Sequence, residues 1–525
     1  MESRQNVIKE LYEKFFQRAF PKVADRLGIV YTPTEIIDFM LKSVNQALSD
    51  EFNTKMGAKN VHILDPFTGT GTFLVKLLSL LDKRDIQRTY NEFLHVCPDG
   101  AVRRGVDRGR PGLARRLMYE LNEVRMRNPR PSVASIGFRD RVRAPRNAQV
   151  VDLFCGCGGM SLGFLANGYR LAGGADLNET AVRTYAENLA PAFVRDVRDL
   201  VGDESELKSF LAGLPDFDPA APTVLVGGPP CQGFTAHRKR SWDVPDPRND
   251  LVSVFARAAV LMLPDAVAME NVPELLSARY RPYFDSFRSV LEAAGYVVRA
   301  GIVNAATFGV PQERFRAVVV AMRSGRFGLP SPRLTPERFA TVRDAIGDLP
   351  PVEAGVAHPS DPMHRSAAHR ASTIATLRAV PRDGGSRPPG TGPACLDRVA
   401  GYYDVYGRLA WGRPSITITH YARNPASGRF AHPEQDRGLT MRETARLQGF
   451  PDWFRFSGSF DQVFGQIGEA VPPPLARGIA EAVSAGLAGR VLRGAAEEAL
   501  EPVSDSYGGV IAAQKMRRAG RSAGV

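Results

Sequence analysis

Through the middle of the chain, from about residue 147 to 325, apolar residues come in short runs that end at glycine, proline or an acid. Runs of this kind, rich in β-branched side chains and bounded by turn residues, are typical of buried strands. We predict strands at 148–154, 169–175, 223–226, 266–269, 299–304 and 317–322, with helices at 160–166 and 251–261. Strands interleaved with helices predict an α/β fold.

One of these runs, 223–226, leads into a sequence that cannot continue as a strand or as a helix. It reads Gly227-Gly228-Pro229-Pro230 and is followed by Cys231. Open α/β sheets bind ligands in loops at the carboxyl ends of their strands. A lone cysteine is more often a small buried apolar residue, but the flanking glycines and prolines favour a rigid, exposed loop. A thiolate there would be a strong nucleophile.

A glycine loop follows the first strand of this region. Cys155-Gly156-Cys157-Gly158-Gly159 separates the predicted strand from the predicted helix. Glycines let a ligand approach the backbone closely, and a helix N-terminus offers free N–H donors. The next strand ends at Asp176, 24 residues after Asp152, a suitable place for a carboxylate that accepts both hydroxyls of a ribose. Asp196 ends a further strand and is suited to an adenine amino group.

A second pattern of strand, glycine loop and helix occurs near the N-terminus. A helix is expected at 8–20, and another begins near Thr34. A strand at 61–64 then runs into the loop 65–73 and a helix at 74–81. This order is typical of a nucleotide cradle.

Charge and composition limit the classes of partner that the chain is expected to bind. A net charge of +12 and a pI of about 9.6 favour a polyanion, nucleic acid first, although a merely basic surface would give the same balance. No run approaches the roughly 18 apolar residues of a membrane span, and no secretory signal opens the chain, so we expect a cytoplasmic protein without membrane contact. Five scattered cysteines predict neither a disulfide framework nor a metal site.

Six motifs occur in the order typical of one enzyme family. They are Asp152 to Gly159, Gly228 to Gln232, Glu270-Asn271-Val272, Gln312-x-Arg314-x-Arg316, Arg442 to Pro451 and Gln466 to Pro473. Together they resemble the ordered motifs of DNA cytosine-5 methyltransferases, over about residues 147–488. One departure stands at Glu469, where the family more often has Asn.

The resemblance implies a Rossmann-like S-adenosylmethionine-dependent methyltransferase domain with a smaller, irregular target-recognition domain. It implies that Cys231 adds to carbon 6 of a flipped-out cytosine and that Glu270 acts at ring nitrogen 3. Arg314 and Arg316 would hold the base carbonyl and the adjacent phosphate. The residues expected to bind S-adenosylmethionine are Phe154, Gly156, Cys157, Gly158, Gly159, Asp176, Leu177, Asp196 and Val197.

The first 95 residues or so resemble a different family, the adenine-amino DNA methyltransferases. They lack the Asn-Pro-Pro-aromatic or Asp-Pro-Pro-aromatic tetrapeptide of the adenine site, and the position of the ribose acid falls near Pro98. We interpret this segment as truncated and dispensable for cytosine methylation. An arginine-rich stretch follows, which we interpret as a linker, with a phosphate-binding arm as the alternative.

These patterns divide the chain into six parts. They are a truncated adenine-methyltransferase-like segment (1–82), the arginine-rich linker (83–146), the catalytic domain (147–325), the target-recognition domain (326–455), a return to the catalytic domain (456–490) and a flexible tail (491–525). In the recognition domain the candidates for contact with phosphate or bases are Arg365, His369, Arg382, Arg387, Arg408 and Arg413.

The sequence therefore predicts a monomeric enzyme that methylates carbon 5 of cytosine in double-stranded DNA as part of restriction–modification. A cognate restriction endonuclease is a candidate partner. The same chemistry on RNA is one alternative, but Ala394-Cys395-Leu396 lacks the Cys-Phe-Thr of the tRNA-directed branch. A DNA-binding protein without catalysis is the other, and the presence of Cys231 and Glu270 disfavours it.

Overall fold

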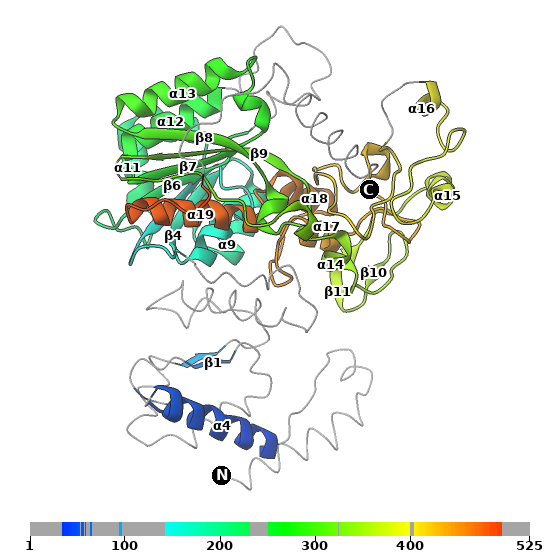
Figure 1. Cartoon of the computed structure of the whole chain (residues 1–525), viewed down its shortest axis with the longest axis horizontal. Coiled ribbons are helices and arrows are strands. Elements are labelled where there is room, and N and C mark those ends of the chain that lie inside the picture. Colours follow the sequence, from blue (N-terminus) through cyan, green and yellow to red (C-terminus); the bar gives the residue numbers. More distant parts are fainter. Residues whose placement is uncertain are drawn as a thin grey trace. The chain divides into compact units, whose positions relative to one another are not determined.

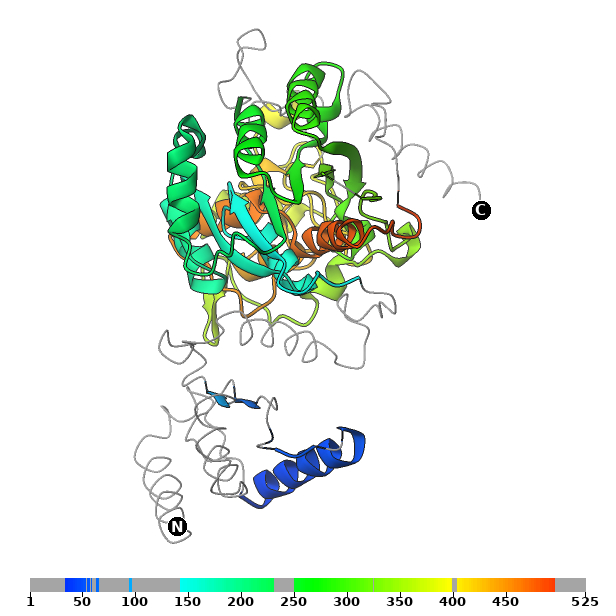
Figure 2. The same cartoon turned by 90° about the vertical axis from the view of Figure 1, so that its left-hand side faces the viewer.

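The structure is a computed structural model. It describes residues 34–52, 54–56, 58, 63–65, 94–96, 142–230, 250–323, 325–398 and 404–495. The chain forms two compact units, Met1–Met118 and Tyr119–Val525, both drawn in Figures 1 and 2. The predicted helices at 8–20 and 74–81 and the tail beyond residue 495 lie outside the described residues.

The first unit contains one described helix and two short strands. Helix α4 spans Thr34–Phe52, as the sequence predicts, and buries Ile37 while Val44 on the expected apolar face is exposed. Strand β1 (Ile63–Asp65) pairs in parallel with β2 (Leu94–Val96). The glycine loop between them lies outside the described residues, and β2 lies within the stretch that we predicted to be linker.

The second unit is built on a seven-stranded sheet of order β5-β4-β3-β6-β7-β9-β8. Its strands are β3 (Gln149–Leu153), β4 (Arg170–Asp176), β5 (Ala192–Val194), β6 (Thr223–Gly227), β7 (Ala266–Asn271), β8 (Val297–Asn304) and β9 (Phe315–Met322). Strands β3 to β7 run parallel, and β9 is antiparallel to both of its neighbours. Strands β3, β6 and β7 are buried along their whole length, which explains their continuous apolar sequences.

Helices cover both faces of this sheet, as Figures 1 and 2 show. Helices α8 (Gly159–Asn167), α9 (Glu179–Asn188) and α19 (Pro473–Leu487) contribute to the hydrophobic core on one face. The other core contains side chains of α10 (Val197–Gly202), α11 (Glu204–Ala212), α12 (Leu251–Met262) and α13 (Arg281–Ala293). The predicted α/β, Rossmann-like fold is confirmed.

The order of the strands reverses between β3 and β6, which are neighbours in the sheet. Leu153 at the end of β3 pairs with Gly227 at the end of β6. The glycine loop and the Gly-Gly-Pro-Pro turn therefore leave the sheet side by side. Such a reversal is the topological switch point at which open α/β sheets bind their ligands.

Residues 326–455 contain few regular elements. They are η8 (Pro336–Arg338), α14 (Val342–Ile346), β10 (Ala357–His358), β11 (Asp361–Arg365), α15 (Ala371–Ala379), α16 (Cys395–Arg398), η9 (Pro425–Ser427) and α17 (Met441–Leu447). Residues 415–419 lie beside 311–313, where Ser415 forms an isolated bridge with Gln312. The Thr417 hydroxyl donates to the Glu313 carbonyl, and the Ile418 N–H donates to the side chain of Gln312, both at 2.9 Å.

Helix α18 (Phe460–Glu469) follows, and α19 then returns to the catalytic sheet and packs on α8. Proline at the first positions of α19 is compatible with a helix start, because the N–H groups there have no partner within the helix. The two helices approach at Gly163, where a Cβ atom would overlap Ala476 and lie 2.5 Å from the Arg477 backbone nitrogen. This contact requires glycine.

We predict that Gly163→Ala destabilises the protein by about 1–3 kcal/mol, because the added methyl group overpacks a rigid backbone contact. Gly465→Ala is the matched control: Gly465 also lies within a helix, but a Cβ there meets nothing within 4 Å. It should gain up to about 1 kcal/mol from helix propensity. Denaturant midpoints test both variants, and an unchanged midpoint for Gly163→Ala would contradict the packing argument.

Candidate functional site

The loop after β3 makes a sharp turn that only a few residue types tolerate. Phe154 has a φ of 61° although it is not glycine, and Gly156 and Gly158 have φ of 49° and 97°. A non-glycine residue in the left-handed region costs roughly 1–3 kcal/mol and is often found at functional sites. A Cβ on Gly156 would meet nothing within 4 Å, so this side of the loop is open.

The other side of the loop is closed by the C-terminal part of the chain. A Cβ on Gly159 would overlap the Val471 carbonyl oxygen and lie 3.3 Å from the Ala470 Cβ. The Cys157 thiol donates to the Gln466 carbonyl at 3.5 Å. The loop that begins at residue 154 therefore shares its site with residues more than 300 positions later in the chain.

Asp176, the predicted ribose acid, lies at the end of β4 beside this loop. Its carboxylate accepts from the Gly156 N–H at 2.9 Å and from the Asn178 N–H at 2.8 Å. Burial raises the pKa of Asp176, while these backbone donors lower it. The next side chain, Leu177, is 66% exposed, unusual for leucine at the end of a buried strand.

Asp152, for which no role was expected from the sequence, is fully buried just before the loop. One of its carboxylate oxygens accepts from the Ser161 hydroxyl at 2.6 Å, and Ser161 also bonds the Tyr185 hydroxyl at 2.8 Å. The other oxygen has no hydrogen-bond partner in the described part of the chain. Burial raises the pKa of Asp152 to about 7, against the Ser161 bond, and the charge of Asp176 raises it further.

Three other residues expected to bind the cofactor are Cys157, Asp196 and Val197. Their surroundings show that not all three can contact a ligand through the side chain. Burial raises the pKa of Cys157 to about 12, so it is a thiol. Asp196 caps α10 by accepting from the Arg198 N–H, and it pairs with the Arg198 guanidinium at 3.3 Å. The Val197 side chain lies in the core, which leaves its backbone for any ligand contact.

The turn after β6 is held against the end of β7. The Asn271 side chain donates to the Pro229 carbonyl at 3.1 Å. A Cβ on Gly228 would lie 4.0 Å from the Glu270 carboxylate. Cys231 itself lies outside the described residues, so its predicted role stays a prediction. The chain leading to it ends beside Glu270.

Glu270 and Arg316 form an ion pair that is largely shielded from solvent. The Arg316 Nε lies 2.9 Å from a Glu270 carboxylate oxygen, and the two side chains are 13% and 10% exposed. The first is on β9 and the second on β7, which are adjacent antiparallel strands. A ring bound beside this pair would meet both a carboxylate and a guanidinium.

The Arg314 guanidinium donates to backbone carbonyls. The side chain is buried, and the guanidinium donates to the carbonyls of Ile418 (2.8 Å), Gly468 (3.2 Å) and Ala470 (3.4 Å). These carbonyls belong to the recognition region and to the segment that closes the glycine loop. The expected contact of Arg314 with base or phosphate stays a prediction, but its observed partners join three parts of the site.

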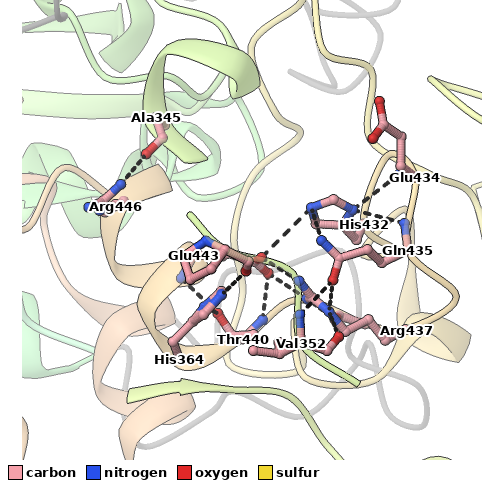
Figure 3. Close-up of polar contacts among 12 residues, drawn as sticks. Ala345, Val352, His364, His432, Glu434, Gln435, Arg437, Thr440, Glu443 and Arg446 are labelled. Carbon is pink, nitrogen blue, oxygen red and sulfur yellow. Dashed lines mark hydrogen bonds and ion pairs between the residues drawn. The ribbon is translucent and has the colours of Figure 1, made fainter. Parts of the chain in front are cut away.

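A buried polar network near α17 was not foreseen from the sequence (Figure 3). Arg437 and Glu443 form a two-point ion pair at 2.7 and 2.8 Å, and the Thr440 N–H donates to Glu443 at 2.8 Å. His364 and His432 flank the pair. Thr440-x-x-Glu443 is a capping box, a signal that the sequence does contain.

The six residues of the recognition domain that were candidates for contact with phosphate or bases differ in their exposure and in their protein partners. Arg408 was wrongly predicted to contact DNA: its guanidinium is fully buried, where it donates to carbonyls that include Leu377 and Gln435 and pairs with Asp436 at 2.6 Å. Arg413 is exposed. The rest have protein partners: Arg365 lies over the Phe460 ring, the Gly438 N–H donates to His369, Arg382 pairs with Asp436, and Arg387 pairs with Asp397.

No cluster of three or more His, Cys, Asp or Glu side chains in the described ranges could hold a metal ion. None of the described helices combines the length and the apolar character needed to cross a bilayer.

Comparison with known families gives two matches. Residues 148–485 match the family described as C-5 cytosine-specific DNA methylase. Residues 3–95 match the N-6 DNA methylase family, which confirms the resemblance of the N-terminal segment to adenine-amino methyltransferases.

Individual relatives agree with the larger match. The chain is 34% identical over 354 residues to the type II methylase M.HgiDII of Herpetosiphon aurantiacus, covering 65% of this chain and 96% of that one. It is 35% identical over 338 residues to the type II methyltransferase M1.HphI of Haemophilus parahaemolyticus, covering 63% and 86%. A crystal structure of a putative DNA modification methyltransferase from an Escherichia coli prophage covers 65% of this chain and all of its own, with a TM-score of 0.52 and 22% identity. That likeness supports the fold.

The buried network predicts a specific acid sensitivity. Burial lowers the pKa of His432 from 6.5 to about 4, so the unfolded chain takes up this proton before the folded one. The contribution of His432 to stability should therefore fall as the pH drops from about 6.5, while Asp152, whose pKa is raised to about 7, contributes in the opposite sense. Glu443, whose pKa is lowered to about 2 by Arg437 despite its burial, adds to the loss only below its ordinary value of 4.5. Integrated over the shift, His432 accounts for up to about 3 kcal/mol.

His432→Asn should flatten this dependence above pH 4.5, because an amide oxygen can accept the two N–H bonds now accepted by the ring nitrogen, from Glu434 and Gln435. Half-buried His358 provides the control, His358→Asn. Urea unfolding at a series of pH values is the measurement. An equally steep loss in His432→Asn would show that another group is responsible.

Proposed function

This chain belongs to the C-5 cytosine-specific DNA methylases and is a DNA (cytosine-5)-methyltransferase, and we propose that it acts through a covalent Cys231 adduct on a flipped-out cytosine. The observation that supports the proposal best is the Glu270–Arg316 ion pair. It lies beside the turn that leads to Cys231, and that turn leaves the sheet at the switch point, next to the glycine loop. The proposed reaction uses a carboxyl group and a guanidinium beside the cytosine ring, and Glu270 and Arg316 supply them from neighbouring strands.

The residues around the glycine loop fit the methyl donor that this family generally uses, S-adenosylmethionine. The open side of Gly156, the exposed Leu177 and the carboxylate of Asp176 lie at the ends of adjacent strands. We propose that Asp176 holds the ribose, that Phe154 and Leu177 enclose the adenine with Asp196 and the Val197 backbone, and that Gly156 to Gly159 border the methionine part. When bound, the cofactor supplies an electrophilic methyl group.

Cys231 begins the reaction on the base. We propose that its thiolate forms a bond to carbon 6, so that the electrons of the 5,6 double bond become available at carbon 5. Carbon 5 then takes the methyl group. Loss of the carbon 5 proton and breaking of the carbon 6–sulfur bond restore the double bond and return the thiolate, so no electrons are gained or lost overall.

Glu270 and Arg316 assist by stabilising the ring as charge builds up. With a proton on its carboxyl group, Glu270 would donate a hydrogen bond to ring nitrogen 3 and relieve negative charge there, and the Arg316 guanidinium would donate to the carbonyl oxygen. In this proposal Arg314 acts as a positioning residue through the three carbonyls that it bonds. The base must leave the duplex to reach these groups, at a cost of a few kcal/mol.

The other parts of the chain are assigned by the same proposal. Residues 326–455 would read the DNA sequence, and residues 456–490 complete the catalytic domain. The N-terminal segment would be a relic, ending after β2 rather than at residue 82, since its family match reaches residue 95. We further propose a role in restriction–modification, by analogy with relatives named as type II methylases.

We predict that DNA from a host expressing the full chain gains 5-methylcytosine and no N6-methyladenine. Cys231→Ser should lower the 5-methylcytosine at least about a hundredfold while the protein still binds DNA, because a serine hydroxyl is a far weaker nucleophile than a thiolate. Digestion to nucleosides and mass spectrometry measures both bases. Retained cytosine methylation in Cys231→Ser would overturn the mechanism, and N6-methyladenine would overturn the reading of the N-terminal segment.

A further inference from the structure

The edge of the seven-stranded sheet opposite the candidate site is rich in arginine. The glycine loop and the turn toward Cys231 follow the carboxyl ends of β3 and β6. Arg146 instead precedes β3, and Arg323 follows β9, whose last residue, Met322, pairs with Ala266 at the start of β7. Strands β3 and β9 have five and eight residues, so the two edges are roughly 17–27 Å apart. Groups at this opposite edge are too distant to take part in the reaction.

Three segments of the chain meet at this opposite edge and are joined by hydrogen bonds. They are 142–147, 325–331 and 488–495. The Ala144 N–H donates to the Asn167 carbonyl at 3.2 Å, and the Asn167 side chain donates to Ser484 of α19 at 2.8 Å. The Ser331 hydroxyl donates to the Arg493 carbonyl, also at 2.8 Å. Distant parts of the sequence are therefore fixed side by side.

These segments, together with the residue that follows β9, contain arginines and no acid. The arginines, which we call the arginine edge, are all exposed and are Arg143, Arg146, Arg323, Arg326, Arg490 and Arg493. Arg323 donates to the Leu263 carbonyl at the end of α12, at 3.1 Å. The side chains of Arg146, Arg490 and Arg493 form no hydrogen bond or ion pair with any residue that the structure describes. These three guanidinium groups are available to a ligand.

Negative groups of the protein itself do not balance the arginine edge. Helices α8, α12 and α19 end there, and each helix end contributes roughly half a negative charge. Asp218 and Asp265 lie on the same side of the sheet, but their carboxylates accept backbone N–H groups, at 2.9 and 2.8 Å. A third acid, Asp216, lies by Arg170, which donates to its carbonyl. Positive charge remains in excess at this edge.

The arginine-rich stretch that the sequence places before the catalytic domain ends at this edge. Its last eight residues, 139–146, contain four arginines and one aspartate. The backbone at Ala144 is held against the end of α8, which is bonded in turn to α19. A phosphate-binding arm, the alternative to a plain linker for this stretch, would therefore continue the arginine edge along the chain.

We propose that the arginine edge binds the phosphate backbone of a second segment of double-stranded DNA, separate from the duplex at the candidate site. Guanidinium groups suit phosphate because their planar donors can form two parallel bonds with it. Contacts of this kind position DNA without reading its sequence. DNA is the polyanion that the enzyme meets as its substrate, and a long molecule bound at the candidate site keeps its other segments at a high effective concentration.

The number of short DNA duplexes bound by the full-length protein, measured by sedimentation and by titration across salt without a methyl donor, tests this assignment. The wild type should bind two, one at the candidate site and one at the arginine edge. A triple variant with Arg146→Gln, Arg490→Gln and Arg493→Gln should bind one of them roughly ten- to a hundredfold more weakly. The salt slope of that step should fall by up to about 2.7, at about 0.9 per lost phosphate contact.

Two further variants separate the arginine edge from net charge and from folding. Arg257→Gln, Arg281→Gln and Arg288→Gln together remove the same charge from α12 and α13, and this variant should still bind two duplexes. Replacing the three arginines of the edge by lysine keeps their charge and should restore most of the lost binding. Melting temperatures of all three variants should stay close to that of the wild type, because the substituted side chains of the edge are exposed.

Several results would overturn the assignment. A wild type that binds a single duplex, or a glutamine variant of the edge that binds two as tightly as the wild type, would show that the edge is only a solvated surface. Equal weakening in the α12–α13 variant would show an effect of net charge alone. Tighter binding of duplex RNA than of DNA would assign the edge to RNA. Because no methyl donor is present, these counts do not depend on methyl transfer, and failure of the proposed function would appear instead as absent 5-methylcytosine.

Discussion

The site depends on one close contact, between the glycine loop after β3 and residues 470–471 near the other end of the chain. No side chain larger than hydrogen fits at Gly159 or, one helical turn further, at Gly163. The contact completes a wall of the proposed cofactor site that the β3 loop cannot form alone. It also brings Glu469 to the loop. The site is therefore complete only when the C-terminal segment packs on the sheet.

Buried side chains that donate to backbone carbonyls fix the position of the returning C-terminal segment against the sheet. Arg314 bonds carbonyls of the recognition region and of the returning segment. Gln312 donates to the Leu447 carbonyl and accepts from the Ile418 N–H. Because buried donors and acceptors are costly to leave unpaired, these bonds fix the position of irregular chain that has few strands or helices. Residues read from the sequence as contacts for a base thus include some that shape the site.

Much of the catalytic fold could be predicted, because its strands are buried on both faces and have continuous apolar sequences. Helix α13 was not predicted, although Phe284, Phe287 and Leu291 have helical spacing and are buried. Arg408 was misjudged because arginine is mostly exposed, and only tertiary structure shows the carbonyls that surround it. The partners of Glu443 could not be predicted from the sequence for the same reason, since its ion pair with Arg437 and its contact with His432 depend on irregular backbone.

The most direct test of the account is a covalent trap. Duplex DNA carrying 5-fluorocytosine at a methylated position should remain linked to the protein after methyl transfer, because fluorine cannot leave carbon 5 as the proton does. With S-adenosylmethionine present, we expect a complex that survives denaturing electrophoresis and whose digestion yields DNA attached to the peptide containing Cys231. No complex with the wild type, or attachment to another residue, would contradict the central claim.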